Sequence, residues 1–253
     1  MHLKDYYGLL TRLFLGYVFF SSGLCKLADG HFGQLIGPPN IISELEHYHL
    51  AGFGFFLAFS QVMIGAMVLS QRWSLAGLIM LVPMNACILA ATFSMQWQGT
   101  PFVNGFLLII NVLALLYEWK TLRFFLFPEV TEIRIPTRTQ QLFPGFWTAL
   151  SVLMVAFLAA ITAGFSNALT MIAGVSVLLL AWYNVWQSVQ ITWLARIPLA
   201  ASLLAIVSLS LTEPLTALKM NVNLPLITGI VLTVIATAAT TLIHWFSKDR
   251  QML

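Results

Sequence analysis

The sequence predicts an all-α membrane protein with eight transmembrane helices in two four-helix units, plus one amphipathic helix at the outer surface. Hydrophobic residues make up 59% of the 253 residues and charged residues only 8%, whereas soluble domains carry about 25% charged residues. Eight apolar segments are each close to the roughly 20 residues that cross a bilayer as a helix. The basic residues fall almost entirely on one side of these segments, which is the pattern of cytoplasmic connections.

The eight predicted spans follow one another with mostly short connections. They are Leu9–Leu27, Gly52–Ser70, Ser74–Met95, Pro101–Trp119, Gly145–Phe165, Asn167–Gln187, Trp193–Leu211 and Leu224–Phe246. With both termini in the cytoplasm, ten of the 12 Lys and Arg residues lie on the cytoplasmic side, and only Lys26 and Lys219 lie outside. Adding or removing one span would scatter the basic residues over both sides, so the span count and the orientation support each other.

The chain divides at its one long predicted cytoplasmic connection. Residues 128–144 are a linker between a first four-helix unit at 1–127 and a second unit at 145–253. In the second unit, one face of the sixth span carries Asn184, Gln187 and Ile191, with Ser188 beside them, and this face is expected to point inward and form hydrogen bonds with neighbouring helices. A ridge of small residues on the last span predicts close helix packing rather than a ligand site; it consists of Gly229, Thr233, Thr237 and Thr241.

The most polar stretch is NIISELEHYHLAGF, between the first two spans. Helical periodicity puts the apolar residues of this stretch on one face, together with Tyr48 and His49, and puts Glu44, Glu46 and His47 on the other. Two residues apart on a helix, His47 and His49 point about 160° away from each other, and no third ligand with zinc-like spacing is present. We therefore expect a surface helix with Tyr48 and His49 directed toward the bundle, and no metal site.

Four stretches of the first half carry a family pattern. They are RLFLGYVFFSSGLCKL with the frame Gly23-x-x-Lys26, then ISELEHYHLAGF, then FSQVMIGAMVLSQRWSLAGLIMLVPMNACILAA, and finally GTPFVNGFLLIINVLALLYEWKTLR. Together these stretches resemble the DoxX family over residues 4–127, whereas residues 145–253 carry no such resemblance. The resemblance implies a bacterial inner-membrane protein that accompanies redox enzymes, such as thiosulfate:quinone oxidoreductases or thiol and superoxide defence proteins.

One position departs from the family pattern. Members often carry a Glu in the second span, three or four residues before a Gly, and this chain has Gln61 ahead of Gly65. A neutral amide does not exchange a proton and does not balance the charge of Arg12 or Lys26. A role that needs a buried carboxylate at this place is therefore in doubt.

Polar groups at membrane depth are the first candidates for function. The candidate ligand-binding residues are Arg12, Lys26, Tyr48, His49 and Gln61. Near them a quinone would find hydrogen-bond donors and an apolar slot for its tail. A snorkelling side chain explains Arg12 equally well, and Glu118 is expected at the surface beside Lys120 and Arg123.

Three functions remain open from the sequence. The first is an accessory membrane subunit of a redox system, possibly linked to quinone; because no haem, flavin or iron–sulfur motif is present, its electrons would come from a partner protein. The second is a small-molecule or lipid transporter, which the break at Pro83 and Asn85 favours and the lack of inverted repeats disfavours. Further polar groups at membrane depth add to this alternative: Asn104, Asn111 and Asn184. The third is a structural subunit of a larger complex.

No catalytic constellation supports an enzyme, and no basic stripe supports nucleic-acid binding. The expected partners are the lipid bilayer and membrane, periplasmic or cytoplasmic redox proteins.

Overall fold

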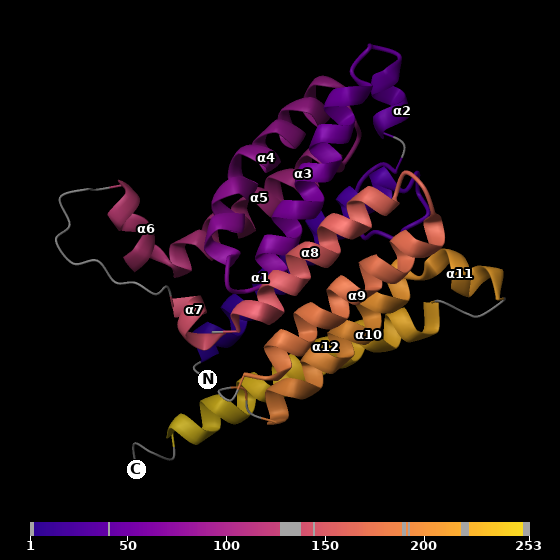
Figure 1. Ribbon diagram of the computed structural model, residues 1–253. Coiled ribbons are helices and arrows are strands. Elements are labelled where there is room, and N and C mark those ends of the chain that lie inside the picture. Colours follow the sequence, from indigo (N-terminus) through magenta and orange to yellow (C-terminus); the bar gives the residue numbers. More distant parts are fainter. Residues whose placement is uncertain are drawn as a thin grey trace.

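The computed structural model describes residues 3–39, 41–126, 138–143, 145–188, 191, 193–218 and 223–249. Every regular element in these ranges is an α-helix (Figure 1). Most of the predicted linker 128–144 lies outside the described residues, as do Lys219 and Arg250 of the charge count.

Six of the described helices are long and apolar enough to cross a membrane. They are α1 (Leu3–Leu27), α3 (Ala51–Leu69), α4 (Ser74–Ser94), α5 (Thr100–Tyr117), α9 (Asn167–Trp186) and α12 (Asn223–Asp249). The predicted fifth and seventh spans correspond to two further apolar helices with shorter apolar lengths, α8 (Phe146–Thr162) and α10 (Trp193–Ser210). The structure therefore shows a multi-pass architecture, and the count of eight spans stays a prediction.

Four short helices join or flank the long ones. They are α2 (Ile41–Glu46), α6 (Trp119–Leu126), α7 (Arg138–Leu142) and α11 (Thr212–Ala217). Figure 1 shows α6, α7, the start of α1 and the end of α12 at one end of the molecule, and α2 and α11 at the other. Two contacts agree with this arrangement: the hydroxyls of Tyr7 and Thr241 lie 2.7 Å apart at the first end, and His31 pairs with Glu213 at the second.

Helix α2 is shorter than the predicted surface helix. The backbone N–H of Leu50 donates to the carbonyl of Leu45, the N–H of His49 donates to the carbonyl of Glu46, and His49 has a φ of 59°. These bonds and this left-handed residue form a Schellman motif, which ends a helix by reversing the chain. Tyr48 and His49 consequently lie in a turn, outside the helical face assigned to them.

Close contact of small residues brings α1 and α3 together. A Cβ added at Gly65 would lie 2.4 Å from the backbone nitrogen of Phe20, and one at Gly23 would lie 2.6 Å from the carbonyl oxygen of Ala58. Such spacing leaves no room for a side chain at either glycine. The conspicuous glycines of the first half are therefore packing residues, which allow two membrane helices to touch along their backbones.

The same principle explains the small-residue ridge on α12. A Cβ at Gly229 would lie 2.7 Å from the Cβ of Ala205 on α10. The prediction that this ridge packs against a helix is confirmed. The inward face of α9 is confirmed for Asn184, whose Nδ2 donates to the carbonyl of Ser70 at 2.8 Å and whose Oδ1 accepts from the hydroxyl of Thr148 at 2.9 Å. Ser188 and Ile191 are buried as well. The inward direction predicted for Gln187 is wrong, because α9 ends at Trp186 and Gln187 caps it with an exposed side chain.

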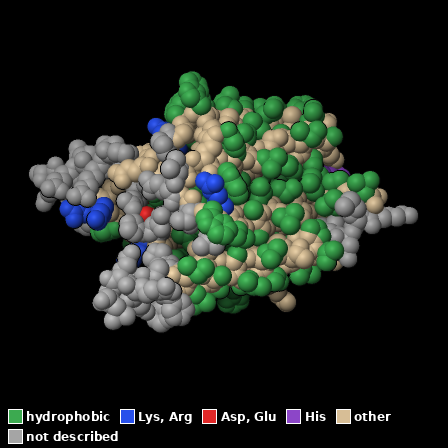
Figure 2. All heavy atoms as spheres, turned by 90° about the horizontal axis from the view of Figure 1, so that it is seen from below, with side chains coloured by type: hydrophobic (Ala, Val, Ile, Leu, Met, Phe, Trp, Pro, Cys, Tyr) green, Lys and Arg blue, Asp and Glu red, His purple; other side chains and the backbone are tan. Residues whose placement is uncertain are grey.

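Two buried clusters form the core. One contains residues of α1, α3, α4 and α5, and the other joins α1 and α3 to α8, α9 and α10. The division into two four-helix units stays a prediction, but the halves share a continuous core through α1 and α3. Large hydrophobic side chains also cover much of the outer surface, and Figure 2 shows them along the flank, with Lys and Arg toward the end where α6 lies. A surface of this kind suits a lipid environment.

Candidate functional site

A mostly apolar cleft opens at the α2 end of the first bundle. Its walls come from α1, α3, α4 and α5, and its roof comes from α2 and the loop before it. The cavity volume is about 100 Å³. Apolar lining residues include Phe19, Ile36, Leu57, Ile88 and Leu107, and the polar ones include Ser22, Lys26, Gln61, Thr92 and Asn104. An apolar slot with a few convergent polar groups is the usual form of a small-molecule site.

Of the described residues that line the cleft, Lys26 alone has an ionisable side chain. Its Nζ donates to the backbone carbonyl of Ser22 at 3.0 Å and to the Ser22 hydroxyl at 2.5 Å, one helical turn earlier. The backbone of Gly37, with a φ of 117°, passes so close that a Cβ there would lie 3.4 Å from this nitrogen. Because a lysine has three N–H donors, these two bonds leave one donor for a ligand.

Two amides face the cleft opposite Lys26. Gln61 comes from the inner face of α3 and Asn104 from the inner face of α5, and both are buried. The Nδ2 of Asn104 has no hydrogen-bond partner among the described residues. A buried donor without a partner destabilises the fold by about 1–3 kcal/mol, so a bound water or ligand oxygen would be stabilised there.

The structure brings together two of the five candidate residues. Lys26 and Gln61 line the same cleft, although they are 35 positions apart in the sequence. Tyr48 and His49 do not line it: Tyr48 is 68% exposed and His49 is exposed in the turn after α2. The expectation that both point toward the bundle is wrong, because the Schellman turn carries them off the helical face.

Arg12 lies at the opposite end of α1. It is 14 positions before Lys26, which is about 21 Å along a helix. Its side chain is only 1% exposed, its Nε donates to Oε1 of Gln71 at 3.0 Å, and its guanidinium stands 5.4 Å from the ring centre of Tyr117. Arg12 therefore does not snorkel to the surface; it is part of a buried polar cluster.

Two buried carboxylates complete the Arg12 cluster. Asp5 and Glu118 both interact electrostatically with Arg12. Asp5 accepts a 2.5 Å hydrogen bond from the Tyr117 hydroxyl, and Glu118 accepts a 3.0 Å bond from the backbone N–H of Thr139. The expectation of a surface position for Glu118 is wrong: it is buried, because α7 folds over the end of α5 and supplies Thr139.

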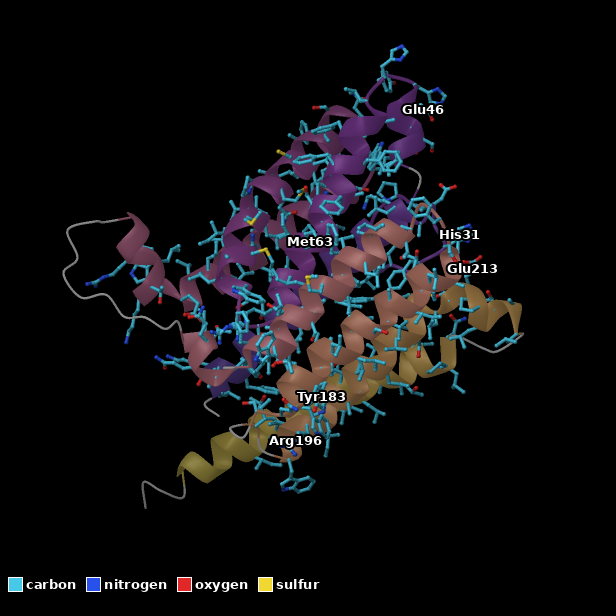
Figure 3. All side chains as sticks on the ribbon, in the orientation of Figure 1. His31, Glu46, Met63, Tyr183, Arg196 and Glu213 are labelled. Atoms are coloured by element: carbon cyan, nitrogen blue, oxygen red, sulfur yellow. The ribbon has the colours of Figure 1, made fainter. Side chains whose placement is uncertain are left out.

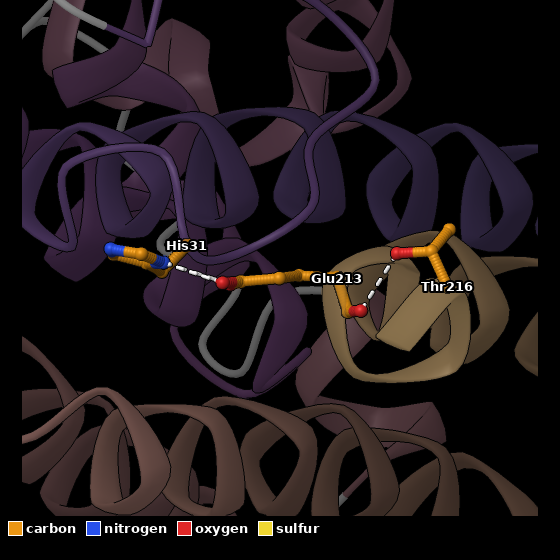
Figure 4. A network of polar contacts seen from close by, with 3 residues as sticks. All are labelled: His31, Glu213 and Thr216. Carbon is orange, nitrogen blue, oxygen red and sulfur yellow. Dashed lines mark hydrogen bonds and ion pairs between the residues drawn. The ribbon is translucent and has the colours of Figure 1, made fainter. Parts of the chain in front are cut away.

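A separate polar contact lies outside the cleft at the α2 end. Figure 3 shows His31 and Glu213 next to each other there, with Glu46 farther out and Arg196 near the other end. In Figure 4 the Nδ1 of His31 meets the Glu213 carboxylate at 2.8 Å, and the Thr216 hydroxyl donates to the Glu213 backbone carbonyl. Both partners of the pair are well exposed, so this contact joins loop to helix rather than forming a binding site.

Sequence reasoning did not assign Ser22, Thr92 and Asn104 to the site. Ser22 precedes Lys26 by one helical turn, so i, i+4 spacing on α1 was an available signal. Asn104, an amide inside a span, indicated an inward-facing residue, and Thr92 gave no such signal. That both line this cleft depends on how α4 and α5 face α1 and α3. Among the described residues, no group of three or more His, Cys, Asp or Glu side chains could hold a metal ion.

Comparison with known proteins finds no relative of this chain. No family model, no curated protein and no solved structure matches the chain. The resemblance of residues 4–127 to the DoxX family consequently stays a prediction, and the site has to be interpreted from its own residues.

Proposed function

We propose that the first bundle binds a lipophilic molecule with hydrogen-bond acceptor oxygens, of the quinone class, in the cleft lined by Lys26, Gln61 and Asn104. The observation that carries this proposal is the pairing of apolar walls with unused donors. The third N–H of Lys26 and the unpartnered N–H groups of Asn104 can each donate a hydrogen bond to an acceptor on the ligand, such as a carbonyl oxygen. A quinone supplies two carbonyl oxygens on one ring and an apolar tail.

The proposed biological role is an accessory subunit of a redox complex in a bacterial inner membrane. A quinone site in a chain without a redox-cofactor motif needs a partner protein to exchange electrons with the quinone. The DoxX-like pattern of residues 4–127 favours such a partnership, although fold-level kinship alone is weak evidence for a reaction. The partners would be membrane, periplasmic or cytoplasmic redox proteins.

The proposed topology has eight spans with both termini in the cytoplasm. In support, the basic residues Arg12, Arg72, Lys120 and Arg123 belong to the beginning of α1, the α3–α4 turn and α6. These are elements of the end at which α1 begins and α12 ends (Figure 1). An excess of basic residues marks the cytoplasmic side, so the cleft at the other end would open toward the periplasm.

A transporter is the second candidate. The interior of α4 carries Pro83 and the fully buried Asn85, and both polar atoms of the Asn85 amide lack partners among the described residues. Pro83 removes one backbone hydrogen bond from the helix. Interrupted helices with polar groups near the middle of the membrane are a feature of many transporter sites.

Tryptophan fluorescence tests the quinone site directly, because Trp97 lines the cleft. Purified protein in lipid nanodiscs is titrated with a short-tailed benzoquinone, a class of molecule that quenches tryptophan emission. We expect saturable quenching that Trp97→Phe largely removes. Lys26→Met and Gln61→Leu should weaken binding on the order of tenfold each, as expected for the loss of one hydrogen bond to a charged or buried donor.

The control variant is Lys120→Met, which removes an exposed lysine of α6 far from the cleft. Its affinity should equal that of the unaltered protein. Equal affinity in Lys26→Met and the unaltered protein would refute the quinone site. The redox role has its own test: purification from native membranes in mild detergent, with mass spectrometry of the proteins retained. A stoichiometric oxidoreductase supports the accessory-subunit role, and a chain that purifies alone contradicts it.

A further inference from the structure

Three asparagines lie between α4 and α5 at and below the base of the cleft. Asn85, Asn104 and Asn111 are all buried. Four of their amide atoms have no hydrogen-bond partner among the described residues: both atoms of Asn85, Nδ2 of Asn104 and Oδ1 of Asn111. Such a concentration of unpartnered atoms is unusual, because buried polar groups in proteins are almost always hydrogen-bonded to protein or to ordered water.

One hydrogen bond between the antiparallel helices α4 and α5 sets their register. The Nδ2 of Asn111 donates to the backbone carbonyl of Leu78 at 3.2 Å. Asn85 follows Leu78 by seven residues, which is two helical turns, and Asn104 precedes Asn111 by the same number. Asn85 and Asn104 therefore stand at the same level on facing helices, and Asn111 lies about 10 Å deeper.

We call Asn85, Asn104 and Asn111 the polar seam; it meets the cleft at Asn104, whereas Asn85 and the deeper Asn111 do not line the cleft. On α4, Thr92 and Ile88 line the cleft. Asn85 lies about one helical turn deeper than Ile88 on the same helix. Leu81 and Leu107, which lie along the seam, and Ala114, which follows Asn111 by less than one turn of α5, belong with Leu15 and Val68 to one buried apolar cluster. Arg12 and its carboxylates lie beyond that apolar cluster, on the far side.

The atoms of the seam select a neutral occupant. They offer donors from Asn85 and Asn104 and acceptors from Asn85 and Asn111, so the matching molecule must both donate and accept. None of the three side chains carries a charge that would balance an ion, and an unbalanced ion is strongly disfavoured at such a depth. Water has the required properties, and a site with several polar partners is where buried water is found.

We propose that the polar seam is a hydrated extension of the cleft, which admits water and small uncharged hydrogen-bonding molecules to Asn111 and excludes ions. The inference goes beyond the quinone site, since it concerns the empty protein and does not depend on which ligand fills the cleft. It makes the first bundle accessible from one end as far as its middle and closed there by the layer of Leu15, Val68 and Ala114.

Cysteine modification with two reagents of nearly equal size tests this proposal. The background carries Cys25→Ala and Cys87→Ala, which replace both natural cysteines. Asn104→Cys, Asn111→Cys and Ala114→Cys are each embedded in lipid nanodiscs and exposed to neutral iodoacetamide or anionic iodoacetate. Intact-protein mass spectrometry follows the rate of modification, and thermal unfolding confirms that each variant is folded.

We expect both reagents to modify Asn104→Cys, which lies in the cleft near Lys26. Asn111→Cys should react with iodoacetamide but at least about tenfold more slowly with iodoacetate, and Ala114→Cys should react with neither, since alkylation needs a hydrated thiolate. Asn85→Cys, at the level of Asn104, is the second variant and should react with iodoacetamide. Phe106→Cys, on the exposed apolar face of α5, should stay unmodified and excludes entry from the lipid.

Three results would overturn the proposal. A folded Asn111→Cys that iodoacetamide does not modify would mean that the seam is dry. Equal rates with iodoacetate and iodoacetamide at Asn111→Cys would mean that ions enter as well. Modification of Ala114→Cys as fast as Asn111→Cys would mean that the bundle is loosened throughout and has no closed layer.

Discussion

Replacement of Gly65 by alanine should separate α1 from α3. The new Cβ would lie 2.4 Å from the backbone nitrogen of Phe20 and 2.8 Å from the carbonyl oxygen of Gly16. Ordinary van der Waals contact begins near 3.4 Å, so the helices must move apart by 3.4 − 2.4 = 1.0 Å at this level. Both neighbouring atoms belong to the backbone of α1, and a rotamer change does not relieve the clash.

The loss of stability expected for Gly65→Ala follows from this geometry. Overpacking of a well-packed interior costs about 1–3 kcal/mol, and the better helix propensity of alanine offsets at most about 1 kcal/mol of that. For a chain of this size, 1 kcal/mol corresponds to roughly 2–4 °C in Tm. Gly65→Ala should therefore lower the apparent Tm by a few degrees, on the order of 5 °C.

Gly105→Ala is the matched control. Gly105 also lies inside a membrane helix, but a Cβ added there meets nothing within 4 Å. Its Tm should stay unchanged or rise slightly, because only the helix propensity changes. The assay is thermal unfolding of both variants in the same mild detergent, followed by intrinsic fluorescence. If Gly65→Ala proves as stable as Gly105→Ala, the α1–α3 contact is not as close as the structure shows, and the argument that these glycines are packing residues fails.

Three further perturbations test the buried contacts outside the cleft. Arg12→Leu removes the hydrogen bond to Gln71 and the positive charge that interacts with Asp5 and Glu118, and it should lower the free energy of unfolding by about 1–3 kcal/mol. Thermal unfolding measures the loss, and the control variant is Arg123→Leu, which removes an exposed arginine of α6. Equal stability of the two variants would contradict the buried Arg12 cluster. Gly33→Ala should lower Tm strongly, because its Cβ would stand 1.8 Å from the carbonyl oxygen of Leu209, whereas Glu213→Gln breaks an exposed ion pair and should cost less than about 1 kcal/mol. A larger loss in Glu213→Gln would show that the ion pair to α11, rather than the backbone contact of Gly33 with α10, holds the outer loop in place. Asn184→Leu removes the bonds to Ser70 and Thr148 and should cost about 1–3 kcal/mol in the same assay; a neutral result would mean that water replaces both bonds.

Asn184 and Tyr48 differ in whether their side-chain directions can be predicted from the sequence pattern. Lipid offers an amide no hydrogen-bond partner, so the inward direction of Asn184 inside a membrane segment follows from solvation alone. The direction of Tyr48 and His49 depended instead on how long helix α2 continues. A left-handed residue at His49 ended the helix three positions after Glu46, and a histidine gives no strong local signal for that conformation.

Glu118 and Asn104 illustrate a second limit. A glutamate at the end of a span, followed by basic residues, has the local pattern of a solvated helix end, and only the fold of α7 across it produces burial. Asn104 faces Lys26 and Gln61 because α5 packs antiparallel to α4 and beside α1. No spacing along the chain contains that information, since the partners are far apart in sequence.

The amino-acid sequence by itself determined the class of this protein: apolar segments of bilayer length with few charges leave no other stable arrangement for the backbone than helices in a membrane. It also determined that Asn184 of α9 and Gly229 of α12 pack against neighbouring helices, because amides and small residues have strong preferences there. Tertiary structure alone decided that Lys26, Gln61 and Asn104 share a cleft, that Arg12 belongs to a separate buried cluster, and that a polar seam continues below the cleft. The reason is physical: solvation and helix periodicity act locally on each segment, whereas a site depends on the register and crossing of helices, which only their mutual packing sets.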